Sequence, residues 1–81
     1  RIAIEDVAFR PDTLVASVGD TVTWSNQDIV WHTVSAGDGG GPWQSGDMER
    51  GAAFTVVLPV PGTIRYTCRY HPTMNGVLVV R

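Results

Sequence analysis

The chain has 81 residues, a formal net charge of −2 and a composition rich in Val, Thr and Gly. This length supports one domain, residues 1–81, with a single hydrophobic core. So small a charge excludes strong attraction to nucleic acid or to an anionic membrane, and no apolar run approaches the length of a membrane span.

Cysteine usage and the start of the chain bear on the compartment. Cys68 is the only cysteine, so the chain cannot form an internal disulfide. In a secreted protein a lone cysteine is an exposed reactive thiol, a buried small hydrophobe or a metal ligand. The sequence begins at Arg1, within an apparent strand, without Met or a signal peptide. We expect a mature or trimmed form of an exported, periplasmic or otherwise extracytoplasmic protein, and a monomer.

Seven short segments predict strands, and none has the 3.6-residue period of a helix. The clearest is 21–26, whose alternation points Val22 and Trp24 inward. Ala36–Gly51 holds six glycines and predicts irregular structure, pinned to the body by Trp43. The predicted strands are Ile2–Phe9, Leu14–Val18, Thr21–Asn26, Ile29–Val34, Ala52–Leu58, Thr63–Cys68 and Val77–Val80, the last after a turn at Asn75–Gly76. Their near-regular spacing predicts an all-β, antiparallel β-sandwich.

Three soft or borderline donors lie close together near the C-terminus: Cys68, His71 and Met74. An unbroken strand could not aim all three at one point, because its side chains alternate between two faces. The chain must therefore turn just after Cys68, and Pro72 gives a reason for such a turn. A thiolate, two imidazoles and a weak axial thioether form the ligand set of a blue-copper centre. The second imidazole can come only from His32, the other histidine of the chain.

Each of these residues also has an ordinary structural interpretation. Cys68 could be a buried thiol, His32 a histidine at a strand end, and Met74 a core residue. The competing thioether, Met48, lies beside Asp47 and other charged residues, so we expect it at the surface. The combination of the three donors at this spacing favours the metal site.

The closing segment carries a family resemblance. Gly62–Cys68, His71-Pro72, Met74 and Gly76–Val80 resemble the end of the small cupredoxins, and the Cys-x-x-His-x-x-Met spacing is most similar to that of amicyanins. Trp24-Ser25-Asn26, with His32 six residues after Asn26, resembles the segment that carries their first histidine ligand. The resemblance implies a Greek-key sandwich of seven to eight strands and one copper ion that cycles between Cu(II) and Cu(I). It implies His32, Cys68 and His71 as equatorial ligands and Met74 as the axial one, in an electron carrier and not an enzyme.

The resemblance also suggests residues around the metal. Asn26 would link loops, and the residue after His32, Thr33, would support the ligands. Amicyanins have Asn in place of Thr33, which leaves their side-chain brace between the two ligand loops open here. Trp31 stands where Pro is common, and Tyr70 stands where amicyanins have Pro. The ring edge of His71, with Pro72 and Thr73, would form a small apolar port for redox partner proteins of unknown identity.

Other functions use the same residues. The chain could be a copper carrier or storage module, or the cupredoxin domain of a larger oxidase or membrane-anchored redox protein. A Cys/His hydrolase is disfavoured, because no third orienting residue is evident and the domain leaves little room for a substrate cleft. Zinc is chemically possible, although the thioether favours copper.

Overall fold

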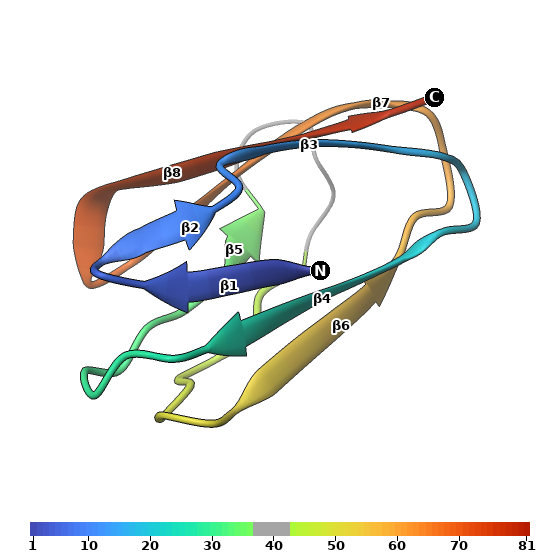
Figure 1. Cartoon of the computed structure of the whole chain (residues 1–81). Helices are drawn as coiled ribbons and strands as arrows, with labels where there is room; N and C mark the ends of the chain where they lie inside the picture. Colours follow the sequence, from blue (N-terminus) through green and yellow to red (C-terminus); the bar gives the residue numbers. More distant parts are fainter. Residues whose placement is uncertain (37–42) are drawn as a thin grey trace.

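The computed structural model describes residues 1–36 and 43–81, apart from the side chain of Pro72. Within these residues eight strands form two four-stranded sheets that pack into a sandwich, which confirms the predicted all-β class (Figure 1). The strands are β1 (Ile2–Glu5), β2 (Ala8–Arg10), β3 (Thr13–Ala16), β4 (Thr21–Asn26), β5 (Ser35–Ala36), β6 (Ala53–Val57), β7 (Gly62–Cys68) and β8 (His71–Val80). No described residue belongs to a helix that is long and apolar enough to cross a membrane.

The strand order is β2-β1-β4-β6 in one sheet and β3-β8-β7-β5 in the other. Most neighbours are antiparallel, but β1 and β4 pair in parallel, and so do β3 and β8. The alternation of apolar residues does not distinguish these two arrangements. Strands joined by a short turn must run antiparallel, whereas the two parallel pairs lie far apart in the sequence and are joined by long crossovers.

The first predicted strand, Ile2–Phe9, is wrong as a single element. The chain folds back after β1, so that Glu5 faces Ala8 across a two-residue turn made by Asp6 and Val7. Both turn residues have positive φ, 53° and 55°, the backbone of a type I′ hairpin turn. Asp6 is typical of the first position of such a turn, but Val7 stands where glycine is usual, so the chain lacks the Asp-Gly or Asn-Gly pair that marks a hairpin.

The prediction of a strand over Ile29–Val34 is also wrong. Only His32 in this segment makes a β-bridge, to Met48, and the short β5 follows at Ser35–Ala36. The Asn26 side chain donates to the carbonyl of Val30 and accepts from the N–H of Asp28, which keeps the chain curled after β4. The apolar residue Ile29 is consequently 79% exposed and has no place in a sheet.

The ligand-bearing hairpin differs from prediction at its second strand. The chain does turn immediately after Cys68, as expected, and Cys68 pairs with His71 across Arg69-Tyr70. No turn occurs at Asn75–Gly76, because β8 continues from His71 to Val80. Thr67 pairs with Asn75, so residues 72–74 form a bulge between the two ladders. The bulge lets His71 and Met74 leave the strict alternation of a strand.

The core is centred on Trp24, which is fully buried between the sheets. Its ring packs against those of Trp43, Phe54 and Tyr66, at centroid distances of 5.4, 5.9 and 5.2 Å. Trp43 therefore pins its loop to the body as predicted, although residues 37–42 of that loop lie outside the described residues.

Met48 is buried, so its predicted surface position is wrong. Its N–H and carbonyl both pair with the backbone of His32, and its carbonyl also accepts from Asn26. These three hydrogen bonds hold the segment against the body, and Met48 faces the core while its charged neighbours Asp47 and Glu49 remain exposed. The polar neighbours that suggested a surface residue therefore say nothing about this side chain.

Tyr66 makes the stability of the fold depend on pH in the alkaline range. Its hydroxyl is buried without a hydrogen-bond partner in the described part of the chain, and burial raises the pKa of Tyr66 to about 12. A tyrosine in the unfolded chain ionises near about 10. Between these two pKa values the unfolded chain releases a proton that the folded chain retains. The free energy of unfolding therefore does not depend on Tyr66 ionisation below pH ~10 and falls above it. We expect a fall of about 1.4 kcal/mol per pH unit within this window.

Urea denaturation between pH 9 and 11.5 measures this fall. Tyr66→Phe should remove most of it, whereas Tyr70→Phe, in the exposed tyrosine, should leave most of it in place. Equal pH dependence in the two variants would contradict the assignment to Tyr66.

Candidate metal centre

Three connections gather at one end of the sandwich, on the left in Figure 1: the β1–β2 turn, the segment after β4 and the β7–β8 turn. The second of these carries His32, and the third joins Cys68 to His71. Residues that are 36 positions apart in the chain are thereby brought into contact. This placement follows from the topology, because β4 and β7 both end at the same pole of the two facing sheets.

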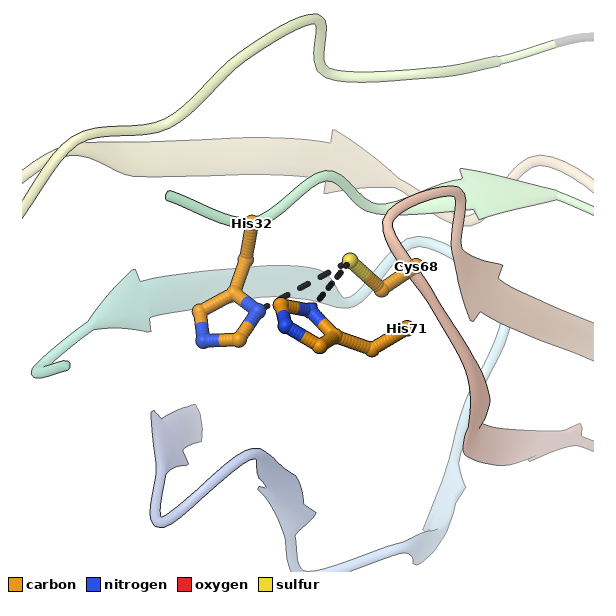
Figure 2. Close-up of side chains that lie close together, drawn as sticks. All are labelled: His32, Cys68 and His71. Atoms are coloured by element: carbon orange, nitrogen blue, oxygen red, sulfur yellow. Dashed lines mark hydrogen bonds between the residues drawn. The ribbon is translucent and has the colours of Figure 1, made fainter. Parts of the chain in front are cut away.

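The sulfur of Cys68 faces two imidazoles that lie next to each other (Figure 2). This Sγ is 3.7 Å from Nδ1 of His32 and 3.6 Å from Nδ1 of His71. The three donor atoms all lie within 4.8 Å of one another. A metal ion bonded to sulfur at about 2.3 Å and to nitrogen at about 2.0 Å, with about 120° between the bonds, separates those donors by about 3.7 Å. The two observed sulfur–nitrogen distances therefore fit one shared ion.

The donors differ in their access to solvent. His32 and Cys68 are buried, at 0% and 1% exposure, whereas the side chain of His71 is partly exposed. Met74, the predicted axial ligand, is buried at 3% exposure, and Met48 is equally buried. The structure thus brings three of the four predicted ligands together and places Met74 in the adjoining core. The axial role of Met74 stays a prediction.

Thr33 joins the two ligand-bearing segments. Its backbone N–H donates to Sγ of Cys68 at 3.3 Å, and its Oγ1 accepts from the N–H of Arg69 at 2.9 Å. A side-chain brace between the two ligand loops is therefore present, although Thr33 stands where amicyanins have Asn. The Thr33 hydroxyl makes it.

Asn26 holds the His32 segment in place, as predicted for a residue that links loops. Its Nδ2 donates to the carbonyls of Met48 at 2.8 Å and Val30 at 3.1 Å, and its Oδ1 accepts from the N–H of Asp28 at 2.9 Å. Because the side chain is fully buried, the loss of any of these bonds would leave a polar group unpaired in the interior. Its effect on a bound metal stays a prediction.

Asp28 was missed by the sequence reasoning. Its Oδ2 is 2.7 Å from Nε2 of His32, the ring nitrogen that points away from Cys68 (Figure 2). Burial alone would raise the pKa of Asp28, but hydrogen bonds from the N–H groups of Val7 and Asp6, together with the contact to His32, outweigh burial and lower the pKa. An aspartate four residues before a candidate histidine ligand was the available signal.

Tyr70 makes a second contact that the sequence did not reveal. Its hydroxyl donates to the carboxylate of Asp47, and this bond raises the pKa of Tyr70 above its ordinary value. The ligand turn is thus tied to the segment that pairs with His32. This side-chain tether stands at the position where amicyanins have a rigid proline.

A two-sheet sandwich with a buried cysteine and two histidines at one pole is the architecture of the small cupredoxins. No protein-family model matches the chain. Amicyanin of Paracoccus denitrificans is 34% identical across 98% of this chain and 63% of its own length. Amicyanin-alpha of Methylorubrum extorquens is 32% identical across 98% of this chain and 69% of its own.

Solved structures give the same result. An amicyanin mutant in the Cu(I) form matches with a TM-score of 0.92 and 30% identity over 99% of this chain and 79% of the other. A copper-containing nitrite reductase from Thermus scotoductus matches with a TM-score of 0.91 and 25% identity, over 99% of this chain but 21% of the reductase. The chain belongs to the amicyanin family of cupredoxins. It spans slightly less than two thirds of the Paracoccus relative, 63%.

Proposed function

We propose that the chain is a type 1 copper protein that carries single electrons between redox partners. The observation that supports this most directly is the meeting of Sγ of Cys68 with Nδ1 of His32 and of His71 at 3.6–3.7 Å. Copper held by two imidazoles, a thiolate and a distant thioether gains and loses one electron with little change in geometry. His32, Cys68 and His71 would hold the ion, and Met74 would be a fourth, weaker donor.

The candidate ligands differ in burial, and we assign them different roles. His32 and Cys68 are buried and braced by Asp28 and Thr33, so they keep their geometry in both oxidation states. His71 is the partly exposed member of the set and offers the shortest route to a partner. We assign the electron-transfer port to His71, Pro72 and Thr73, of which Thr73 is exposed.

A hydrolase remains disfavoured, but for a different reason from the one given by the sequence. Asp28, His32 and Cys68 do form a carboxylate–imidazole–thiol row, so a third orienting residue exists. A nucleophile that is 1% exposed cannot reach a substrate, however. The 160 Å³ cavity between the β1–β2 turn and residues 73–75 is lined by neither Cys68 nor His32.

Addition of Cu(II) to the metal-free protein tests the proposal. We expect an intense blue thiolate-to-copper absorption band at one ion per chain, and a reversible reduction potential with the copper retained in both states. Rapid loss of Cu(I) to a mild chelator would favour the copper carrier or storage module. A colourless complex would contradict a type 1 site.

The two buried thioethers allow the axial ligand to be identified. Met74→Leu should shift the reduction potential upward and change the relative intensities of the absorption bands, because a weak donor to Cu(II) is removed. Met48→Leu makes the same change of side chain at equal burial and should leave both properties unchanged. Cyclic voltammetry and optical spectra of the copper-loaded variants measure the difference. The reverse result would assign the axial position to Met48.

Redox partners would dock on exposed apolar side chains around the site. Exposed apolar side chains occur in three segments near the site. Val7 lies in the β1–β2 turn, Tyr70 directly precedes His71, and the residues just before His32 include Ile29, Val30 and Trp31. A small apolar surface of this kind suits the weak, brief contacts of an electron carrier. The rate of electron self-exchange between two copies of the protein, measured by NMR, should fall in Trp31→Asp. An unchanged rate would remove Trp31 from the docking surface.

The match to about a fifth of a nitrite reductase supports a second candidate, a cupredoxin domain within a larger redox protein. The full gene product decides between this and a free carrier. In either case we propose an exported, extracytoplasmic location, which fractionation of the source cells tests.

A further inference from the structure

The carboxylate of Asp28 receives hydrogen bonds from two distant parts of the chain. Oδ1 accepts from the N–H of Asp6 at 2.8 Å and Oδ2 from the N–H of Val7 at 2.9 Å, both in the β1–β2 turn. Oδ2 also lies 2.7 Å from Nε2 of the fully buried His32. One side chain therefore connects the first hairpin of the protein to a ligand of the candidate metal centre.

The β1–β2 turn has a conformation that suits this contact. Asp6 and Val7 both occupy the left-handed region, at φ 53° and 55°, which is unfavourable for a β-branched residue such as Val7. The gain is that two successive N–H groups point to the same carboxylate, as in the small backbone concavities that bind anions. The turn thus fixes the position of the Asp28 carboxylate. The backbone N–H of Asp28 donates to Oδ1 of Asn26, which holds the residue from the other side.

A fixed carboxylate determines which nitrogen of His32 carries the proton. Ionised aspartate can only accept hydrogen bonds, so Nε2 of neutral His32 must be the donor. Nδ1, which faces Cys68, is then left with a free lone pair for a metal ion. We propose that Asp28 is a positioning residue, which uses the β1–β2 turn to hold His32 in the ligand-competent tautomer before any metal binds.

This inference builds on the proposed function, yet its main test needs no metal. Long-range ¹⁵N–¹H NMR spectra of the metal-free protein should show His32 protonated at Nε2. Asp28→Asn should produce a mixture of tautomers or the Nδ1-protonated form, since an amide can donate as well as accept. Asp20→Asn is the matched control: the Asp20 carboxylate also caps a turn, at the N–H of Ser17, and that turn adjoins neither histidine. The control should leave the His32 signals unchanged.

Copper binding gives the second readout. Asp28→Asn should weaken Cu(II) binding by about 10- to 100-fold, the usual effect of removing an outer partner of a histidine ligand. Asp28→Glu keeps the negative charge and should retain the Nε2–H form of His32 at least in part. This variant provides the test if Asp28→Asn fails to fold.

The outcomes separate the two proposals. A single Nε2–H tautomer in Asp28→Asn would overturn the positioning role, whatever the copper results. A chain that binds no copper while its His32 tautomer follows Asp28 would overturn the proposed function and leave the positioning role intact.

Discussion

Replacement of Cys68 by serine is expected to abolish the blue absorption band of the copper-loaded protein. Sγ of Cys68 is the atom shared by both contacts to the imidazoles, and the N–H of Thr33 is directed at it. A serine hydroxyl has similar size but is a hard, un-ionised donor, and it supplies no thiolate-to-copper transition. Copper affinity should fall by more than the roughly 10- to 100-fold that follows loss of an outer-shell partner.

Optical titration with Cu(II) and thermal unfolding of the metal-free variant measure the two consequences. The metal-free Cys68→Ser protein should stay folded, because the substitution removes little buried volume. Thr33→Ser is a suitable control, since it keeps both the N–H and the hydroxyl that brace the site and should keep the band. A blue band that persists in Cys68→Ser would place the chromophore elsewhere.

The part of the site that is local in sequence could be predicted. The spacing of Cys68, His71 and Met74 required a turn directly after the cysteine, and the structure has one. His32 could be proposed by elimination, because the chain has no other histidine to supply the second imidazole. Its contact with Cys68, 36 residues away, depends on which strand ends share a pole, and only the fold shows this.

The link between Asp28 and the first hairpin could not be predicted from local pattern. The partners of Asp28, Asp6 and Val7, lie 22 and 21 residues upstream, and they come within reach because β1 pairs in parallel with β4. Apolar alternation is the same for parallel and antiparallel neighbours and carries no information on this choice. The same limit explains Met48, which is buried because its segment pairs with His32. Its charged neighbours in sequence suggested the opposite.

The largest loss of stability is expected from Gly76→Ala. Asn75–Gly76 resembled a turn, but Gly76 lies within β8 and pairs with Tyr66 of β7. A Cβ at Gly76 would overlap the Cζ, Oη and Cε2 atoms of the Tyr66 ring. This ring cannot swing aside, because it is fully buried and packs against Phe9 at 4.7 Å and Trp24 at 5.2 Å. Overpacking of a rigid core usually costs about 1–3 kcal/mol, and we expect a value at or above the upper end.

Urea denaturation of matched glycine variants tests whether the cost arises from the ring. Gly46→Ala is the control: Gly46 has a φ of 72° and no atom within 4 Å of the added Cβ, so only backbone strain of about 1 kcal/mol applies. Combining Gly76→Ala with Tyr66→Leu removes the overlapping ring atoms, so the double variant should be more stable than the sum of the two single losses predicts. If Gly76→Ala were no more destabilising than Gly46→Ala, or if the two changes were additive, β8 would not pass beneath Tyr66 in solution. The bulge that places His71 and Met74 would then need a different register.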